Sequence, residues 1–265
     1  MKSNAYFESP FLLISGPCVV ESEAIVFEIA SRLKDISERH GVTLLFKASY
    51  KKANRSKLSS FTGIGDEAAL SILGEVRHKF NVPVITDVHS EQEVELASQF
   101  VDVLQIPAFL CRQTELLLAA GQSGKVVNVK KGQFVSPDSM RFAVEKVLST
   151  GNKNVWLTER GVSFGYQDLV VDFRSLPTMK EIGVPVIMDA THALQMPNQK
   201  AGVTGGTPQW IPQMALSSLI WGADGVFMET HPDPSKALSD GANMLPLDKM
   251  DALVNSMVTL KKTMV

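Results

Sequence analysis

The sequence predicts an α/β barrel, because short apolar runs alternate with helical patterns from one end of the chain to the other. The apolar runs are largely uninterrupted by polar residues, as in parallel strands that are buried on both faces. Eight strand–helix units within 265 residues fit a (β/α)8 barrel of the TIM type. A doubly wound sheet is the alternative, but no Gly-x-Gly-x-x-Gly follows the first strand.

Taken in order, each expected strand is followed by an expected helix. We place the strands at Phe11–Ser15, Thr43–Phe46, Pro83–Asp87, Val101–Ile106, Val126–Val129, Asn154–Thr158, Pro185–Asp189 and Gly225–Met228. We place the helices at about Glu23–His40, Asp66–Phe80, Glu91–Gln99, Gln113–Ala120, Pro137–Ser149, Leu176–Ile182, Pro212–Trp221 and Pro246–Lys262. A ninth apolar run, Val170–Phe173, is expected to be a connection after the sixth strand.

Capping residues support these boundaries. Ser22 stands before an apolar stripe at helical spacing, and Ser90 marks a second helix start. Gly41, Asn81 and Gly183 each follow a predicted helix and precede a strand, as residues that end helices in a left-handed conformation do. Helices and strands are therefore expected to be joined by short connections.

The composition indicates a single domain over residues 1–265. Apolar residues make up 45% of the chain and charged residues 20%, so one large core can form. The net charge of −2 argues against nucleic acid as a partner, because such a surface carries a basic excess. No apolar run approaches the roughly 20 residues that cross a bilayer, and the start of the chain is polar rather than signal-like. We therefore expect a cytoplasmic protein that does not bind membranes.

Cations gather where the predicted strands end, at the rim where barrel enzymes carry their chemistry. The set comprises Lys47, Lys52, Arg55, Lys130 and Arg160, with the Ser49 and Ser56 hydroxyls beside them. An arginine binds phosphate through two parallel hydrogen bonds, and a lysine supplies a point charge. A solvated basic turn is the alternative for the stretch around Arg55. The whole set predicts an anion site large enough for two phosphorylated ligands.

A second set of rim residues combines a thiol, an imidazole and two carboxylates: Cys18, His192, Glu229 and Asp240. These donors suit a divalent metal such as Zn²⁺ or Fe²⁺, with Mn²⁺ as a further option. A lone cysteine is more often a small buried hydrophobe, so both interpretations stay open from the residues alone. The other cysteine, Cys111, is expected to be structural.

Two connections are longer than ordinary strand–helix loops. Residues 193–209 carry three glycines, and residues 230–245 carry two prolines. Loops of this length are candidate lids or metal-site loops, with disordered insertions as the alternative.

Six short motifs contain most of the polar rim residues. They are Gly16-Pro17-Cys18, Lys47-Ala48-Ser49, Lys52-Ala53-Asn54-Arg55-Ser56, Pro107-Ala108-Phe109-Leu110-Cys111-Arg112-Gln113-Thr114, Val127-Asn128-Val129-Lys130-Lys131 and Ser239-Asp240-Gly241. Together they resemble the 3-deoxy-D-manno-octulosonate 8-phosphate (KDO 8-phosphate) synthases, over about residues 11–247. The resemblance implies condensation of phosphoenolpyruvate with D-arabinose 5-phosphate and water. The products would be the eight-carbon keto-sugar acid phosphate, used in lipopolysaccharide biosynthesis, and inorganic phosphate.

Carried over by position, the resemblance implies a role for each rim residue. Phosphoenolpyruvate would be bound by Lys47, Ser49, Lys52, Lys130 and Arg160. The sugar phosphate would be held by Asn54, Arg55 and Ser56, and by Arg112 from a neighbouring subunit, so a homotetramer is implied. Lys47 and Lys52 would also act in catalysis by neutralising the charges that keep the substrates apart, and Asp87, His192 and Asp240 would move protons or orient water.

Cys18 indicates the subclass within this resemblance. Relatives with cysteine at this place are metal-dependent, whereas those with asparagine work without metal. The implied ligands are Cys18, His192, Glu229 and Asp240, and the metal could polarise the aldehyde, orient the substrates or help to activate water.

Two other functions are kept as alternatives. The 3-deoxy-D-arabino-heptulosonate 7-phosphate synthases share the barrel, phosphoenolpyruvate and a similar metal set, but use erythrose 4-phosphate. Their sugar loop usually reads Lys-Pro-Arg-Thr-Ser, unlike Ala53-Asn54-Arg55-Ser56 here. The alternative of another class is a non-catalytic metal-binding barrel.

Overall fold

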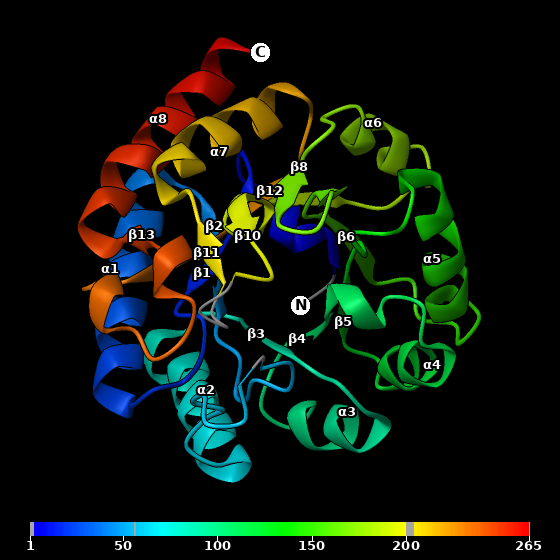
Figure 1. The fold of residues 1–265 in the computed structure, drawn as a ribbon, viewed down its shortest axis with the longest axis horizontal. Coiled ribbons are helices and arrows are strands. Elements are labelled where there is room, and N and C mark those ends of the chain that lie inside the picture. The colour runs from blue at the N-terminus through cyan, green and yellow to red at the C-terminus, as the bar shows by residue number, and fades with distance from the viewer. Residues whose placement is uncertain (1–2, 56, 200–203, 265) are drawn as a thin grey trace.

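Within residues 3–55, 57–199 and 204–264, which the computed structural model describes, eight parallel strands close into a barrel (Figure 1). They are β1 (Leu12–Gly16), β2 (Thr43–Lys47), β3 (Val84–Asp87), β4 (Val103–Ile106), β5 (Val126–Lys130), β6 (Val155–Glu159), β9 (Val186–Asp189) and β12 (Gly225–His231). Neighbours in this order pair with each other, and β12 pairs with β1 to close the ring. The prediction of a (β/α)8 barrel is confirmed.

Helices cover the outside of the barrel, as Figure 1 shows. They are α1 (Glu23–His40), α2 (Asp66–Phe80), α3 (Glu91–Ala97), α4 (Thr114–Gln122), α5 (Met140–Leu148), α6 (Ser175–Lys180), α7 (Ile211–Ile220) and α8 (Met250–Thr263). Short 3-10 helices add η1 (Ser3–Phe7), η2 (Ala108–Leu110), η3 (Pro137–Ser139), η4 (His192–Leu194), η5 (Pro208–Trp210), η6 (Pro234–Lys236), η7 (Gly241–Asn243) and η8 (Leu247–Lys249). In the described ranges, no helix has the length and apolar character needed to cross a membrane.

α1 illustrates how local sequence sets the boundaries. The Ser22 side chain accepts a hydrogen bond from the Ile25 backbone N–H at 3.4 Å, which caps the amino end. Gly41 ends the helix at φ 64°, a left-handed conformation that glycine adopts without steric cost. Ile29 and Leu33 are buried against the barrel. Both predicted ends of this helix are confirmed.

Three strand pairings lie outside the predicted alternation. β7 (Val162–Phe164) and β8 (Asp168–Val170) form an antiparallel hairpin, β10 (Gln195–Met196) pairs with β11 (Gly205–Gly206), and β13 (Leu245–Pro246) pairs with β12. The expectation that residues 170–173 form only a connection is therefore wrong at Val170. The hairpin strands have three residues each and mostly exposed side chains, so no apolar pattern marks them.

The lower part of the barrel interior is apolar. Its inward side chains are Leu12, Ile14, Leu45, Ile85, Val103, Val126, Trp156, Ile187 and Phe227. Tyr6 and Phe7 of η1 pack edge-on against Trp156, each with ring centroids 5.1 Å apart. η1 thus closes the amino-terminal end of the barrel with aromatic rings.

Two residues further along, most strands turn a polar side chain toward the same axis, because strand side chains alternate with a period of two. We call this set the polar layer; it comprises Lys47, Asp87, Gln105, Asn128, Thr158, Asp189 and Glu229. Hydrogen bonds connect neighbouring strands across it. Thr158 donates to Asn128 at 2.7 Å, Asn128 to Gln105 at 3.0 Å, and Gln105 to Asp87 at 2.6 Å.

Candidate active site

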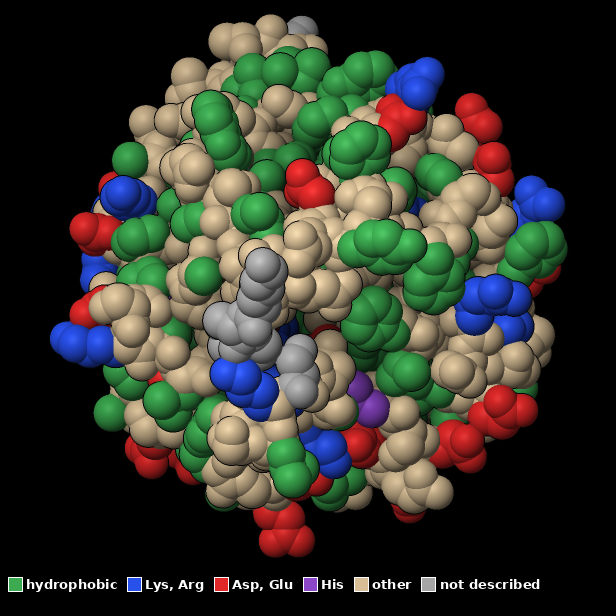
Figure 2. Space-filling model, viewed as in Figure 1, with side chains coloured by type: hydrophobic (Ala, Val, Ile, Leu, Met, Phe, Trp, Pro, Cys, Tyr) green, Lys and Arg blue, Asp and Glu red, His purple; other side chains and the backbone are tan. Residues whose placement is uncertain are grey.

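A cavity of about 1090 Å³ opens above the polar layer, at the carboxyl-terminal end of the barrel. We call it the mouth cavity; its lining includes Lys47, Lys52, Arg55, Asp87, Lys130, Arg160, His192 and Asp240. Figure 2 shows this end of the molecule, where Lys, Arg and His side chains gather near the middle of the face. Residues from distant parts of the sequence are thus brought to one place, as expected of barrel strand ends.

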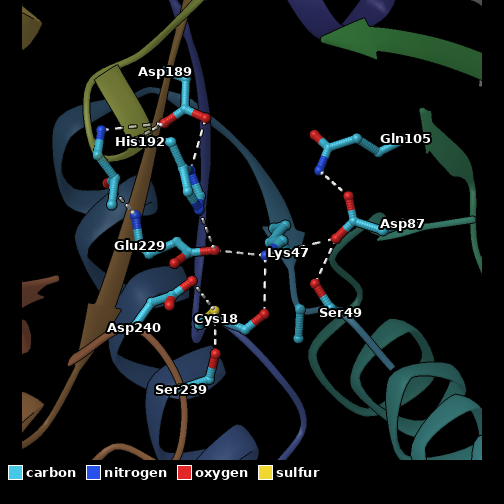
Figure 3. A network of polar contacts seen from close by, with 12 residues as sticks. Cys18, Lys47, Ser49, Asp87, Gln105, Asp189, His192, Glu229, Ser239 and Asp240 are labelled. Atoms are coloured by element: carbon cyan, nitrogen blue, oxygen red, sulfur yellow. Dashed lines mark hydrogen bonds and ion pairs between the residues drawn. The ribbon is translucent and has the colours of Figure 1, made fainter. Parts of the chain in front are cut away.

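Lys47 is held at the centre of this network (Figure 3). Its Nζ donates hydrogen bonds to Glu229 Oε1 at 2.6 Å and to the Cys18 carbonyl at 3.0 Å, and lies 3.9 Å from Asp87 Oδ2. The Lys47 side chain is 1% exposed, so its charge depends on these acceptors for stabilisation. Burial alone would raise the pKa of Glu229, but Lys47 and His192 lower it to about 2.

Lys130 forms a second buried pair, with Asp189. The Lys130 Nζ donates to Asp189 Oδ2 at 2.7 Å and lies 3.9 Å from the centroid of the Phe227 ring. The same carboxylate oxygen is 2.8 Å from His192 Nδ1. Burial opposes ionisation of Asp189, but His192 and Lys130 outweigh it and hold its pKa below the usual range. Burial lowers the pKa of Lys130, against the pull of Asp189.

Arg160 presents a buried donor to the mouth cavity. Its Nη2 donates to Gln195 Oε1 at 2.7 Å and to the His192 carbonyl at 3.4 Å. Its Nη1 is buried and has no hydrogen-bond partner among the described residues. A buried guanidinium nitrogen without an acceptor is costly, so an anionic ligand in the cavity would satisfy it.

Asp87 and Ser49 lie on the opposite side of Lys47 (Figure 3). The Ser49 hydroxyl donates to Asp87 Oδ2 at 2.5 Å. Burial would raise the pKa of Asp87, but Lys47, Lys52 and Lys130 hold it below its usual range. Asp87 is therefore a charged acceptor in the resting site rather than a proton donor.

Cys18, Glu229 and Asp240 meet beside Lys47 and form what we call the thiol–carboxylate corner. Their ligand atoms all lie within 4.8 Å of one another. Glu229 Oε2 is buried without a hydrogen-bond partner in the described part of the chain, and Cys18 Sγ is 3.5 Å from Asp240 Oδ2. Burial, with Glu229 nearby, raises the pKa of the Cys18 thiol to about 12. An acceptor left unsatisfied beside a thiol and a second carboxylate fits a divalent cation.

His192, the fourth predicted ligand, is near this corner but is not one of the three. Its Nε2 lies 3.5 Å from Glu229 Oε1, while Nδ1 faces Asp189. A carboxylate on one ring nitrogen leaves the other free for a ligand or a proton.

Similarity to known proteins identifies the family of this chain. Residues 7–265 match the DAHP synthetase I family. The chain belongs to the DAHP synthetase I family. Curated relatives named 2-dehydro-3-deoxyphosphooctonate aldolase include proteins of Desulfatibacillum aliphaticivorans and Syntrophotalea carbinolica, each 51% identical. The first match covers 98% of this chain and 95% of the relative, and the second covers 95% and 91%. A Brucella ovis relative of the same name is 47% identical over 96% of this chain and 92% of its own.

The sugar-phosphate residues predicted for this DAHP synthetase I family member are only partly assembled. Asn54 and Arg55 line the mouth cavity, and Arg55 Nη1 lies 3.7 Å from Asp240 Oδ1. Arg55 also donates through Nη2 to the Ser239 hydroxyl. Ser56 lies outside the described residues. Arg112 is exposed and does not line the cavity; its carbonyl accepts a hydrogen bond from Lys146 at 3.0 Å. Its implied role at a neighbouring subunit's site stays a prediction.

Two residues of the site had no role predicted from the sequence. Gln105 orients Asp87, and Asp189 pairs with both Lys130 and His192. Both stand in the last two positions of predicted strands, two residues beyond an inward apolar side chain. Because side chains alternate along a strand with a period of two, the apolar residue two positions earlier was a signal for each of them.

Proposed function

We propose that this chain condenses phosphoenolpyruvate with D-arabinose 5-phosphate and water to give KDO 8-phosphate and inorganic phosphate, a step in lipopolysaccharide biosynthesis. The observation that carries the proposal is the buried cation set of the mouth cavity, Lys47, Lys130 and Arg160, in a chain whose relatives at 47–51% identity share the name of this aldolase. The sugar loop, Ala53-Asn54-Arg55-Ser56, favours arabinose 5-phosphate over erythrose 4-phosphate.

Phosphoenolpyruvate would lie deepest, over the polar layer. Lys130, Arg160, Lys47, Lys52 and Ser49 are proposed to neutralise its phosphate and carboxylate. Burial lowers the pKa of Lys52, but Cys18, Glu229 and Asp87 outweigh this effect, so the Lys52 pKa is raised and its charge is retained. Cations fixed before the substrate arrives lose little reorganisation energy when charge moves in the transition state.

The sugar phosphate would occupy the outer part of the cavity. Asn54, Arg55 and Ser56 are proposed to bind it, with Arg112 of a neighbouring subunit in a homotetramer. When the charges of both bound substrates are neutralised, the nucleophilic carbon of phosphoenolpyruvate can lie against the aldehyde of the sugar. The reaction then takes place within one complex and needs no collision between two anions. A carbon–carbon bond then forms, water adds to the enol carbon, and phosphate leaves by carbon–oxygen cleavage.

Asp87, His192 and Asp240 are assigned to moving protons or orienting water. His192 is the best placed, because Asp189 holds Nδ1 at 2.8 Å and leaves Nε2 facing Glu229 and the cavity. Asp87, hydrogen-bonded by Ser49 and Gln105, is proposed to orient water or substrate as a fixed acceptor.

The thiol–carboxylate corner is proposed to hold a divalent metal, Zn²⁺, Fe²⁺ or Mn²⁺, with Cys18, Glu229, Asp240 and His192 as ligands. Glu229 Oε2, which is buried and has no hydrogen-bond partner among the residues that the structure describes, supports this assignment. When bound, such an ion supplies Lewis-acid polarisation or orientation at the substrates.

We also propose that residues 1–265 form one domain and that the protein is cytoplasmic. Cooperative unfolding tests the first proposal, and cell fractionation tests the second.

The activity is tested by incubating the purified chain with phosphoenolpyruvate and arabinose 5-phosphate and measuring phosphate release and product mass. The expected result is stoichiometric phosphate and KDO 8-phosphate. Faster turnover with erythrose 4-phosphate would instead support the heptulosonate synthase, and binding of phosphoenolpyruvate without turnover would support the non-catalytic barrel.

The metal assignment is tested separately by chelation and by metal analysis. The expected result is one divalent metal per chain, loss of phosphate release after chelation, and recovery on adding Zn²⁺, Fe²⁺ or Mn²⁺. Full activity of a chain that metal analysis shows to be metal-free would contradict the metal-dependent subclass.

A further inference from the structure

One buried ion pair lies beside the mouth cavity without lining it. Lys131 follows directly after β5 and Glu159 is the last residue of β6; their side chains are 0% and 1% exposed. Lys131 Nζ lies 3.3 Å from Glu159 Oε1. Neither residue is among those that line the cavity. Two charges have thus been removed from water outside the lining of the cavity.

Each member of the pair adjoins a cation of the anion site in sequence. Lys131 follows Lys130, and Glu159 precedes Arg160. Because side chains alternate along a strand, Lys130 points to Asp189 inside the barrel, and Lys131 points the opposite way. The pair therefore lies on the outer side of the two strand ends whose inner sides carry Lys130 and Arg160.

The pair fastens the backbone of both strand ends. Glu159 Oε1 accepts hydrogen bonds from the backbone N–H of Arg160 at 2.9 Å and of Gly161 at 2.6 Å. Lys131 Nζ donates to the Gly161 carbonyl at 3.1 Å, and to the carbonyls of Gly132 and Val135, each at 3.4 Å. Gly161 thus contacts the carboxylate through its N–H and the ammonium through its carbonyl.

Gly161 makes this double contact through a conformation that other residues avoid. Its φ is 87°, and a Cβ at this place would lie 3.0 Å from the Val170 carbonyl oxygen. In this conformation the backbone N–H and the carbonyl of Gly161 both face the Lys131–Glu159 pair.

A buried ion pair is weak evidence for stability, because desolvation of the two charges offsets their attraction. Here one carboxylate oxygen holds the Arg160 backbone directly, and the ammonium opposite ties the same turn to the end of β5. We propose that Lys131 and Glu159 are positioning residues that hold Lys130 and Arg160 at the phosphoenolpyruvate site. This inference rests on the proposed function, because it takes these two cations to bind phosphoenolpyruvate.

The test measures phosphoenolpyruvate binding by calorimetry in the full chain, without the sugar, for Lys131→Met, Glu159→Gln and the double variant. The expected result is a rise in the dissociation constant of about tenfold or more, since small displacements of positioned groups weaken binding and catalysis strongly. The KM for phosphoenolpyruvate is expected to rise as well, while the KM for arabinose 5-phosphate changes little. This split separates positioning from a general loss of structure.

Each single variant leaves one buried charge unpaired and can fail to fold, whereas the double variant removes both charges together. The double variant therefore decides the outcome in that case, with Glu159→Asp, which keeps the charge, as a milder change that should bind with intermediate affinity. The matched control is Lys180→Met. Lys180 also pairs with a carboxylate, Asp224 at 2.8 Å, and with a glycine carbonyl, Gly222 at 2.9 Å, but it lies on α6, where it ties the turn preceding β12.

Folded double and Glu159→Asp variants that bind phosphoenolpyruvate as tightly as the original chain would overturn the positioning role. An equal loss of affinity in Lys180→Met would also overturn it, because the effect would then be general. No binding by the unaltered chain would overturn the proposed function itself, and this inference with it.

Discussion

The two ends of the barrel interior use the same strands for opposite purposes. At the amino-terminal end, side chains such as Trp156, Val126 and Phe227 form an apolar cluster that Tyr6 closes. Two residues further along β6, β5 and β12 stand Thr158, Asn128 and Glu229, which are as deeply buried but polar. Burial alone therefore does not distinguish core from site. Buried charged groups that line the mouth cavity, such as Lys47 and Lys130, mark the site.

Removing a cation from the mouth cavity, at the carboxyl-terminal end of the barrel, should lower activity strongly. Lys130→Met should lower kcat/KM by about 10²- to 10³-fold or more, the range seen when one fixed electrostatic contact is removed. Steady-state kinetics with both substrates measures this. Lys34→Met, which alters a half-buried lysine 3.7 Å from Glu38 on α1, is the control and should leave kcat/KM unchanged. Near-normal activity of Lys130→Met would show that the cations at the carboxyl-terminal end of the barrel do not carry the chemistry.

A change in the apolar cluster at the amino-terminal end of the barrel should lower stability rather than activity. Trp156→Ala should lower the free energy of unfolding by about 3–5 kcal/mol, because a large ring that packs against Tyr6 and Phe7 is replaced by a cavity. Phosphoenolpyruvate affinity of the folded fraction should stay the same. Urea unfolding and calorimetry measure the two quantities, with Trp156→Phe as the milder variant. A large loss of affinity with unchanged stability would reverse the proposed division of roles.

The two cysteines sharpen the comparison, because both are fully buried thiols. Cys18→Ala should weaken metal binding by about 10- to 100-fold or more and reduce activity accordingly, since a ligand at the thiol–carboxylate corner is lost. Cys111→Ala should leave metal content unchanged, because Cys111 packs near Gly132, outside the corner. Metal analysis after dialysis measures both. Equal metal content in the two variants would remove Cys18 from the metal site.

The smallest expected effect concerns the rim, where Glu93 of α3 accepts hydrogen bonds from His89 at 2.8 Å and lies 2.8 Å from Lys51 Nζ. Burial would raise the pKa of Glu93, but His89, Lys51 and Tyr50 lower it to about 2. A carboxyl group whose folded pKa is depressed stabilises the fold above its unfolded pKa, and this stability is lost as pH falls toward the folded value. The stability difference between the original chain and Glu93→Gln should therefore be largest near neutral pH and shrink between about pH 4.5 and pH 2. Urea unfolding at several pH values measures it, and a difference that does not depend on pH would contradict this assignment.

Local sequence patterns predict much of this arrangement. Uninterrupted apolar runs predict the eight strands, and the polar residues that end them predict Lys47 and Lys130 at the rim, because both patterns are local properties of the chain. Pairing between strands is not local. That Asp189 faces Lys130, or that Tyr6 packs edge-on against Trp156, depends on how distant parts of the chain meet in the closed ring. The β7–β8 hairpin was not predicted for a different reason. Its side chains are mostly exposed, so its strands do not show the apolar pattern of a buried strand.

The preference for arabinose 5-phosphate is tested most directly by a competition between the two sugar acceptors. The chain is incubated with phosphoenolpyruvate, divalent metal and equal concentrations of arabinose 5-phosphate and erythrose 4-phosphate, and the products are separated by mass. The eight-carbon phosphate is expected to accumulate in large excess over the seven-carbon one. Excess of the seven-carbon product, or neither product, would contradict it.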